Sequence, residues 1–464
     1  MDLHLQADTI CAIATPAGEG GIGIVRISGP EALKVAGRLF RPRGPARSLQ
    51  SHRLTLGRIV DPSTGAVLDE VLLCYMAAPR TYTREDVVEI NCHSGYAVLS
   101  AILELVLSSG ARLAEPGEFT RRAYLNGRID LSQAEAVIDV IRSQSRQSLL
   151  HAERQLQGEF RAMVTGWRES LLALQARLEA AIDFSEDLDG DAEQDLSATA
   201  LLDELFEPIS RYLEESREGQ VLREGLTLVL AGKPNVGKSS LLNALLGKDR
   251  AIVTPFPGTT RDVIEDSFLL SGVLVRVLDT AGIRRKPDEI ESYGIERTLR
   301  CVEESDAVLW LADRSRPLNE EDDAVFRSLF GKRVILLLNK NDLPPAFPAG
   351  EIEARFGTDF PVLEISALNA GDVDRLRAHL SEAFLRRPVE LSRSTLIPNL
   401  RHRACIERAM ESLDRARTLI ASGAYPELLS EECLQARRHL EAILGLERDD
   451  ELLDRVFSLF CIGK

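Results

Sequence analysis

The chain carries a phosphate-binding loop near its middle, and this loop dictates the local structure on either side of it. Residues 232–239 read Gly-Lys-Pro-Asn-Val-Gly-Lys-Ser, which fits G-x-x-x-x-G-K-[ST]. The apolar run Leu226 to Ala231 before it is typical of a buried strand, and Leu241 to Leu246 continues as an apolar helix. In such a unit the loop N–H groups surround the β- and γ-phosphates, Lys238 adds a positive charge and the Ser239 hydroxyl can ligate Mg²⁺. The sequence therefore predicts a domain that binds a nucleoside triphosphate.

Three later segments indicate which base is bound. Asp279-Thr-Ala-Gly282 follows the strand-like run Val273 to Leu278 and brings a carboxylate to the metal side of the γ-phosphate. Asn339-Lys-Asn-Asp342 follows another buried-strand pattern. An aspartate there accepts hydrogen bonds from the N1–H and exocyclic amine of guanine, which adenine does not offer. Ser366-Ala-Leu368 is expected to close over the base. Together these segments predict that the nucleotide is GTP.

At this point the chain resembles the translation-factor-like GTPases. Gly258-Thr-Thr-Arg-Asp262 is similar to their second switch element, and Thr260 is placed to reach Mg²⁺ and the γ-phosphate. The residues expected around GTP are Asn235, Val236, Gly237, Lys238, Ser239, Ser240, Thr254, Pro255, Phe256, Pro257, Gly258, Thr259, Thr260, Asp279, Thr280, Ala281, Gly282, Asn339, Lys340, Asp342, Ser366, Ala367 and Leu368.

The catalytic residues depart from those of the small GTPases. Those proteins carry a glutamine after the Asp-x-x-Gly segment to orient the attacking water, whereas this chain has Ile283, which cannot position water. The polar stretch 288–297 supplies carboxylates, and Glu291 is the residue we expect to take over this role, beside Lys238 and Thr260. The alternative is that the glutamates of this stretch form only a solvated face.

A cation should also replace the missing arginine finger, because negative charge builds up in the transition state. Asn235 supplies an amide oxygen, and Thr254-Pro-Phe-Pro257 supplies carbonyl groups next to two residues that lack an N–H. These acceptors are suited to a monovalent ion, although a simple turn before Gly258 explains the same residues.

Length and composition place that domain within a larger protein. The 464 residues suggest about three domains, and 44% hydrophobic residues allow each a core. No apolar run is long enough to span a membrane, and the first eight residues show no signal segment, so a cytoplasmic protein is expected. The seven cysteines are scattered without a CxxC pair, which favours reduced thiols over disulfides or a zinc site.

The net charge of -16 argues against a protein that binds nucleic acid by bulk attraction, so any RNA contact must be local or shared with a partner. Acid is concentrated in Asp183 to Glu207, predicted as an exposed joint between helices. Near the N-terminus, Gly18-Glu-Gly-Gly-Ile-Gly23 satisfies G-x-G-x-x-G. A dinucleotide site is rejected there because the following residues, 24–28, are strand-like, and Arg38, Arg41 and Arg43 stand about where an acid is required.

Changes in hydrophobic period divide the chain into domains. Residues 1–118 alternate in short runs, as in Thr9 to Ala14, Gly23 to Ile27 and Glu70 to Tyr75, mixed with a helical stretch over 97–107, which predicts an α+β domain. Apolar residues recur at helical spacing from Leu131 to Ile182, and a further helix continues to about Gly219, so the first part of a helical domain is expected over 119–222. The GTPase domain is expected over 223–386, and 387–464 is helical again over 401–419 and 431–460. The last piece is too short for its own core, so the predicted fold is a discontinuous helical domain with an inserted Ras-like α/β domain.

Four further peptides extend the resemblance over the whole chain, which is similar to the MnmE (TrmE) family of tRNA-modification GTPases. They are Gly20-Gly-Ile-Gly-Ile-Val-Arg-Ile-Ser-Gly29, Tyr82-Thr-Arg-Glu-Asp-Val-Val-Glu89, Glu115-Pro-Gly-Glu-Phe-Thr-Arg-Arg-Ala-Tyr-Leu-Asn-Gly127 and Phe460-Cys-Ile-Gly-Lys464.

The resemblance implies a folate-binding N-terminal domain that forms a homodimer, and a Ras-like domain that potassium stimulates. It further implies an MnmG-like partner carrying FAD and NADH. The complex would add an aminomethyl or carboxymethylaminomethyl group to C5 of the wobble uridine of certain tRNAs, taking one carbon from 5-formyl- or 5,10-methylene-tetrahydrofolate. By the family pattern K⁺ would bind Asn235, Thr254, Phe256 and Thr259, Mg²⁺ would bind Ser239 and Thr260, and Glu291 would orient water. Folate would bind Arg26, Glu89, Arg128 and Lys464.

Several residues differ from the commoner family pattern. The chain has His93-Ser-Gly95 in place of His-Gly-Gly, Arg128 in place of lysine, and Pro255 and Pro257 in the ion loop. Arginine keeps the charge but changes the donor geometry. Cys461 is either a reactive thiol or a packed one, and His93 either a proton shuttle or a structural histidine.

Two other functions share some of these motifs. A ribosome-assembly GTPase of the Era or Der type has the same phosphate loop and switch, but carries a basic RNA-binding domain. A non-catalytic switch would use GTP only to set its conformation.

Overall fold

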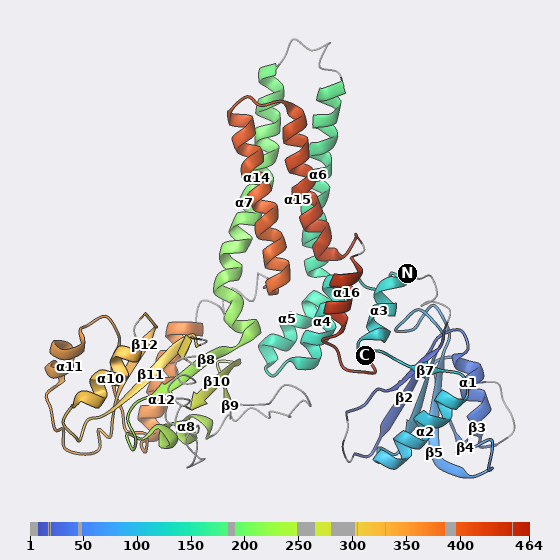
Figure 1. Cartoon of the computed structure of the whole chain (residues 1–464), viewed down its shortest axis with the longest axis horizontal. Coiled ribbons are helices and arrows are strands. Elements are labelled where there is room, and N and C mark those ends of the chain that lie inside the picture. The colour runs from blue at the N-terminus through green and yellow to red at the C-terminus, as the bar shows by residue number, and fades with distance from the viewer. Residues whose placement is uncertain are drawn as a thin grey trace. The chain divides into compact units, whose positions relative to one another are not determined.

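The structure is a computed structural model that describes residues 8–16, 18, 20–44, 49–183, 191–247, 265–279, 302–303, 305–329, 331–385, 396–447 and 449–464. The chain divides into two compact units (Figure 1). The first consists of Met1–Ile138, Gln155–Leu188 and Thr418–Lys464, and the second of Asp139–Arg154 and Asp189–Arg417. Among the described helices, none is long and apolar enough to cross a membrane.

A seven-stranded sheet forms the N-terminal part of the first unit, with strand order β3-β4-β5-β6-β2-β1-β7. All pairs are antiparallel except β1 with β7. The strands are β1 (Ile10–Ile13), β2 (Gly23–Ser28), β3 (Phe40–Pro42), β4 (Arg53–Val60), β5 (Val67–Met76), β6 (Val87–Cys92) and β7 (Arg112–Leu113). Residues 24–28 are indeed a strand, which confirms that the glycine-rich segment before them joins two strands.

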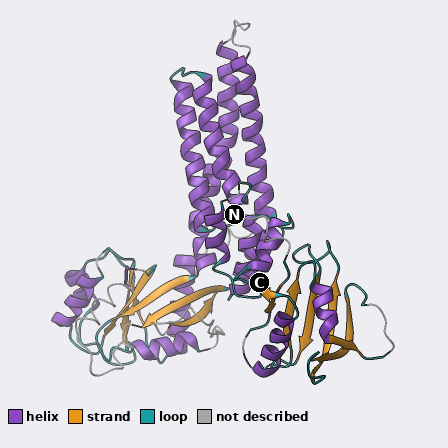
Figure 2. Ribbon diagram, turned by 45° about the vertical axis from the view of Figure 1, so that its right-hand side comes forward, coloured by secondary structure: helices purple, strands orange, loops and turns teal. Residues whose placement is uncertain are grey.

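Two helices, α1 (Ala32–Leu39) and α2 (Tyr96–Ser108), cover one face of this sheet (Figure 2). They bury alternate residues of the central strands, such as Val25, Leu73 and Ile90, as the period of a half-buried strand requires. On the opposite face, three leucines of β4 and β5 are exposed: Leu54 by 61%, Leu56 by 40% and Leu72 by 40%. This open face carries the cluster described below.

Besides α1 and α2, the first unit contains the helices α3 (Glu118–Leu125), α6 (Glu159–Asp183), α15 (Pro426–Leu444), α16 (Asp450–Phe457) and most of α4 (Leu131–Arg142). Arg168 on α6 pairs with Glu441 on α15 at 2.7 Å, and Figure 1 shows these helices side by side. The C-terminal residues therefore pack on helices that precede the GTPase motifs, as predicted. The predicted helix 431–460 is interrupted, because Gly445 adopts a left-handed conformation and Asp449 caps a new helix.

A six-stranded sheet forms the core of the second unit, in the order β13-β12-β11-β8-β10-β9. Its strands are β8 (Leu226–Ala231), β9 (Glu265–Leu270), β10 (Val273–Asp279), β11 (Ala307–Asp313), β12 (Val334–Asn339) and β13 (Val362–Glu364). Only β9 is antiparallel to its neighbour. All seven residues of β11 are buried, as expected for a parallel strand covered on both faces.

Helices lie on both faces of this sheet, which gives the predicted Ras-like α/β architecture. Those of one face are α8 (Lys238–Leu246) and α12 (Ala370–Leu380), continued by η3 (Ser381–Leu385), and those of the other are α10 (Glu320–Ser328) and α11 (Ala349–Phe356). The second unit also holds α7 (Asp191–Glu224) and most of α5 (Arg146–Leu156) and α14 (Leu400–Ala421).

One prediction about the acidic segment is wrong. Residues 191–207 belong to the helix α7 rather than to a joint, since apolar residues such as Leu202, Leu205 and Ile209 recur at helical spacing and are buried. Residues 184–190 lie outside the described part of the chain. The domain boundaries at 118, 222 and 386 stay predictions.

Candidate functional site

The phosphate loop lies between the end of β8 and the start of α8, as the motif predicts. Gly232 and Gly237 have φ values of 144° and 101°, which disfavour any other residue. A side chain at Gly237 would also overlap Asn339 Nδ2, and one at Gly232 would overlap the Leu311 carbonyl. The loop therefore presents its backbone N–H groups at the N-terminus of α8, an arrangement that attracts anions.

The side chains of the loop differ in exposure according to the roles predicted for them. Lys238 is 7% exposed, and its ammonium donates to the carbonyl groups of Gly232 at 2.6 Å and Lys233 at 2.7 Å. A phosphate in the loop would compete for the same ammonium. Asn235 and Ser239, predicted to bind K⁺ and Mg²⁺, are exposed and accessible to ions.

Asn339 connects three of the predicted segments. Its side-chain Nδ2 donates to the Val236 carbonyl at 2.7 Å, and its Oδ1 accepts from the Ala367 N–H at 2.9 Å. The residue is 2% exposed. The structure thus brings the phosphate loop, the Asn339-Lys-Asn-Asp342 segment and the Ser366-Ala-Leu368 loop together around one amide, as the predicted guanine site requires.

Lys340 is held by a residue that the sequence motifs do not include. Its backbone has a φ of 65°, and its Nζ donates to Asp313 Oδ2 at 2.7 Å. Asp313 ends β11, is 6% exposed, and also accepts from the Ser315 N–H and hydroxyl. Burial alone would raise the pKa of Asp313, but the hydrogen bonds from Lys340 and Ser315 outweigh it and hold the pKa below its usual range. The sequence signal that could have identified Asp313 is an aspartate at the end of a buried apolar strand.

The loop expected to cover the base is supported by a second unpredicted acid. Asp372 in the first turn of α12 accepts from the Ser366 N–H at 2.8 Å, and the Ser366 hydroxyl accepts from the Leu368 N–H at 3.3 Å. Leu368 is 83% exposed, and Asp342 is exposed as well. The Asp342 carboxylate is thus accessible to a guanine base.

Much of the predicted catalytic and ion site lies outside the described residues. These positions are Thr254, Pro255, Phe256, Pro257, Gly258, Thr259, Thr260, Thr280, Ala281, Gly282 and Glu291. Asp279 ends β10, where its backbone pairs with Leu230 just before the phosphate loop. Its strand position is the one that the motif requires.

The four predicted folate residues gather on the open face of the N-terminal sheet and at the chain end. Arg26 and Glu89 are cross-strand partners on β2 and β6, and Arg26 Nε donates to Glu89 Oε1 at 2.9 Å. Arg26 Nη1 donates to the Gly463 carbonyl at 3.1 Å, which brings Lys464 alongside. Burial and the charge of Arg26 lower the pKa of Lys464.

Tyr82 lies at the centre of this cluster. The Arg128 guanidinium is 4.6 Å from the centroid of the Tyr82 ring and donates to the Tyr82 carbonyl at 3.0 Å. The Arg26 guanidinium is 5.9 Å from the same ring, and the Tyr82 and Thr120 hydroxyls are 2.8 Å apart. The cluster formed by Arg26, Tyr82, Glu89, Arg128 and Lys464 therefore combines three cations, one acid and an aromatic ring.

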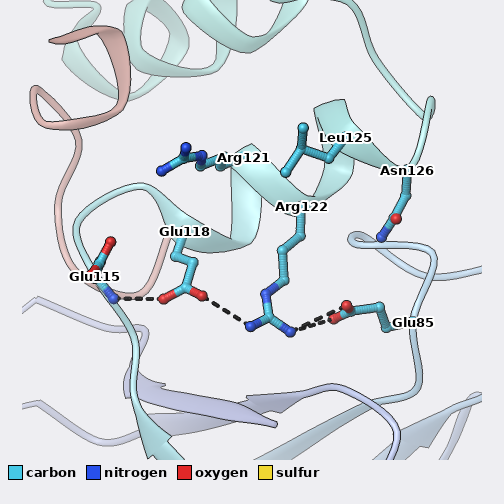
Figure 3. Close-up of a pocket in the computed structure, with 7 residues that line it drawn as sticks. All are labelled: Glu85, Glu115, Glu118, Arg121, Arg122, Leu125 and Asn126. Carbon is cyan, nitrogen blue, oxygen red and sulfur yellow. Dashed lines mark hydrogen bonds and ion pairs between the residues drawn. The ribbon is translucent and has the colours of Figure 1, made fainter. Parts of the chain in front are cut away.

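A pocket beside α3 is lined by charges that pair with each other (Figure 3). Its lining residues are Glu85, Glu115, Glu118, Arg121, Arg122, Leu125 and Asn126. Arg122 is 5% exposed and bonds to Glu118 at 2.9 Å and to Glu85 at 3.2 Å, while Arg112 bonds to Glu118 at 2.6 Å. Burial raises the pKa of Glu118, but the hydrogen bonds from Arg112 and other partners outweigh it, and the pKa is lowered. This network fixes α3, whose Phe119 ring lies 5.7 Å from the Arg26 guanidinium.

Cys461, predicted as either a reactive or a packed thiol, and His93, predicted as either a proton shuttle or a structural histidine, are both exposed. Cys461 is exposed, whereas burial raises the pKa of the thiols of Cys11 and Cys433 to about 12. His93 Nδ1 lies 2.7 Å from Asp69 Oδ1, and its ring is 72% exposed. No group of three or more metal-binding side chains occurs among the residues that the structure describes.

The chain is similar to known proteins over its whole length. The family described as "GTP-binding protein TrmE N-terminus" matches residues 9–128, and the family described as "MnmE helical domain" matches residues 131–461. The tRNA modification GTPase MnmE of Syntrophobacter fumaroxidans is 62% identical over 100% of both chains. That of Geobacter sulfurreducens is 45% identical over 98% of this chain and 99% of its own.

Among solved structures, the G domain of the T. maritima FeoB iron transporter covers 36% of this chain and 98% of its own, at 24% identity. Its TM-score is 0.25, too low to establish a common fold. The two family matches and the full-length identities are decisive: this chain belongs to the MnmE family of tRNA modification GTPases.

Proposed function

We propose that this protein hydrolyses GTP with K⁺ stimulation and, with an FAD- and NADH-dependent partner, modifies C5 of the wobble uridine of certain tRNAs. The added group is aminomethyl or carboxymethylaminomethyl, and its carbon comes from a one-carbon tetrahydrofolate. The observation that carries the proposal is the coexistence, in a member of the MnmE family, of a guanine site organised by Asn339 and a cationic cluster joined by Arg26 to the chain end.

The nucleotide half of the proposal assigns a role to each residue of the loop. The N–H groups before α8 and the Lys238 ammonium bind the phosphates, and the Asp342 carboxylate recognises guanine. Ser239 and Thr260 bind Mg²⁺. The ligands of K⁺ are Asn235, Thr254, Phe256 and Thr259, all of which offer the oxygen donors that an alkali ion prefers. Bound K⁺ supplies positive charge against the phosphates, and Glu291 orients the attacking water.

The folate half rests on the chemistry of the cluster. A reduced folate has a pterin edge rich in N–H groups and a carboxylate tail. Glu89 is suited to accept from the pterin edge, and Arg128 and Lys464 to bind the carboxylates. Arg26 holds Glu89 in place, and the Tyr82 ring offers an apolar surface for a flat ligand. The carbon donor is 5-formyl- or 5,10-methylene-tetrahydrofolate.

The protein acts as a cytoplasmic homodimer that forms a larger complex with its MnmG-like partner. The exposed Leu54, Leu56 and Leu72 on the open sheet face are suited to burial against another subunit. Transfer RNA binds mainly through the complex.

Nucleoside analysis of tRNA from cells lacking the gene tests this function. Loss of the C5 substituent at the wobble uridine, restored by the wild-type gene, is the expected result. Unchanged modification together with a ribosome-assembly defect would instead support a GTPase of the Era or Der type. Absence of GTP hydrolysis in both KCl and NaCl would support a non-catalytic switch.

A further inference from the structure

One segment of the N-terminal domain has a charge opposite to that of the whole chain. The protein has 72 acidic and 56 basic residues, yet residues 32–60 contain no aspartate or glutamate. The same segment contains Lys34, Arg38, Arg41, Arg43, Arg47, Arg53 and Arg58. Of these, Arg47 lies outside the described residues, and the other six are exposed.

The fold gathers these six cations along one edge of the sheet. Strand β3 is the edge strand, and Arg41 on it is the cross-strand partner of Arg58 on β4. The Arg43 N–H donates to the Leu56 carbonyl, so that Arg43 continues the pairing. Lys34 and Arg38 come from α1, which leads directly into β3, and Arg53 begins β4. We call this group, Lys34, Arg38, Arg41, Arg43, Arg53 and Arg58, the basic edge.

Little of this charge is neutralised within the protein. Lys34 pairs with Glu31 at 2.5 Å, and Arg43 and Arg58 share Glu70 at the longer distances of 3.7 and 3.8 Å. Arg38 donates to the Ser109 carbonyl and Arg41 to those of Gly37 and Phe40, which are uncharged. Six cations against two acids leave a local charge of about +4. Arg41 and Arg58 lie on neighbouring strands, which are about 4.8 Å apart.

Protection of an exposed sheet edge does not require so many charges. A few lysines, a proline or a short strand suffice to prevent edge-to-edge pairing, and β3 is already only three residues long and ends in Pro42. The basic edge also extends onto α1, which has no free backbone edge to protect. Binding of a ligand therefore explains the number and position of these charges better than protection of the sheet edge against aggregation does.

We propose that the basic edge is a docking surface for the phosphate backbone of RNA. This inference rests on the proposed function, in which the RNA is a tRNA. Five of the six cations are arginine, whose planar guanidinium binds phosphate with two hydrogen bonds. The one phenylalanine, tyrosine or tryptophan within residues 32–60 is Phe40, which is 4% exposed, so bases have no ring to stack on. The contact is consequently electrostatic, independent of sequence and strongly dependent on salt.

The test compares two triple variants of the full-length protein in tRNA binding at several KCl concentrations. In R41Q/R43Q/R58Q, the affinity is expected to fall about tenfold or more in low salt, and the slope of log K against log salt to decrease by about 2. The matched control R408Q/R438Q/R455Q removes three exposed charges from α14, α15 and α16 and is expected to bind as the wild type does. GTP turnover is expected to be the same in all three proteins.

Wild-type affinity and salt slope in R41Q/R43Q/R58Q would overturn the inference while leaving the proposed function intact, provided that wobble modification still depends on the gene. Loss of partner binding with unchanged tRNA binding would overturn it too, because the surface would then serve a protein. If the triple variant does not fold, R43Q alone carries the test, with an expected decrease in slope of about 1.

Discussion

The Lys340 ammonium donates to the buried Asp313 carboxylate at 2.7 Å, which ties the end of β11 to the Asn339-Lys-Asn-Asp342 segment after β12. The backbone of Lys340 has a positive φ of 65°, and the hydrogen bond to Asp313 fixes the direction of its side chain. We therefore expect Asp313 to act as a positioning residue for base binding, through Lys340.

Asp313→Asn is expected to weaken GTP and GDP binding about tenfold, because the charge that orients Lys340 is lost. Nucleotide titrations check this result. In a Lys340→Ala background the same substitution is expected to have little further effect, since residues that act through one another are not additive. Equal losses in both backgrounds would show that Asp313 is only structural.

Asn339→Ala is expected to lower the stability of the folded protein more than Asp313→Asn does, and to abolish its stabilisation by nucleotide. The Val236 carbonyl and the Ala367 N–H are both buried and would lose their partner, at about 1–3 kcal/mol for each group. Thermal unfolding with and without GDP checks this prediction, and nucleotide should no longer raise the melting temperature. Full stabilisation by GDP would contradict the assigned role of Asn339.

Glu89→Gln is expected to weaken reduced-folate binding about tenfold and to leave GTP turnover unchanged. The neutral amide pairs less strongly with Arg26 and accepts less well from a pterin edge. Glu70→Gln is the matched control, because Glu70 is an acid of the same sheet that lies outside the cluster. Equal folate affinity in wild type and Glu89→Gln, measured by calorimetry, would remove Glu89 from the site.

Arg122→Ala is expected to destabilise the protein by about 3–5 kcal/mol, because Glu118 and Glu85 would be left without that partner in a buried network. Burial raises the pKa of Glu118, but the hydrogen bonds from Arg112, the Glu115 N–H and Arg122 outweigh it and hold the pKa below its ordinary value of 4.5. The Arg122 part of this shift makes the effect of the substitution depend on pH. A depressed folded-state pKa contributes stability above pH 4.5, and this contribution is lost as the pH falls through the folded-state value. Urea unfolding of wild type and variant at pH 7 and below pH 4.5 checks both points. A difference that does not shrink in acid would contradict this account.

The sequence motifs were sufficient to predict that the phosphate loop, the Asn339-Lys-Asn-Asp342 segment and the Ser366-Ala-Leu368 loop come together, because they constrain backbone and side chain together. Guanine binding by these segments stays a prediction. The positive φ of Gly237 and its close approach to Asn339 show why both residues are required. The strands and helices around the motifs were predictable from their apolar runs, as in β8 and β12.

Contacts between distant segments were not predictable from the sequence in the same way. Asp313 meets Lys340 across 27 residues, and Arg112 meets Asp8 across 104. The position of Gly463 beside Arg26, 437 residues away, depends on how the last helix returns to the N-terminal domain. No hydrophobic period reports such pairings. The resemblance to the family predicted the gathering of Arg26, Glu89, Arg128 and Lys464, and the residues alone did not.

The central claim is that an alkali ion and Glu291 replace the glutamine and arginine of other GTPases. Single-turnover GTP hydrolysis by the purified protein, in KCl and in NaCl of equal ionic strength, tests it most directly. We expect KCl to accelerate hydrolysis at least tenfold, and Glu291→Ala to lower the rate in KCl on the order of 10²-fold while GTP affinity is unchanged. Equal rates in the two salts, or a wild-type rate in Glu291→Ala, would contradict the claim.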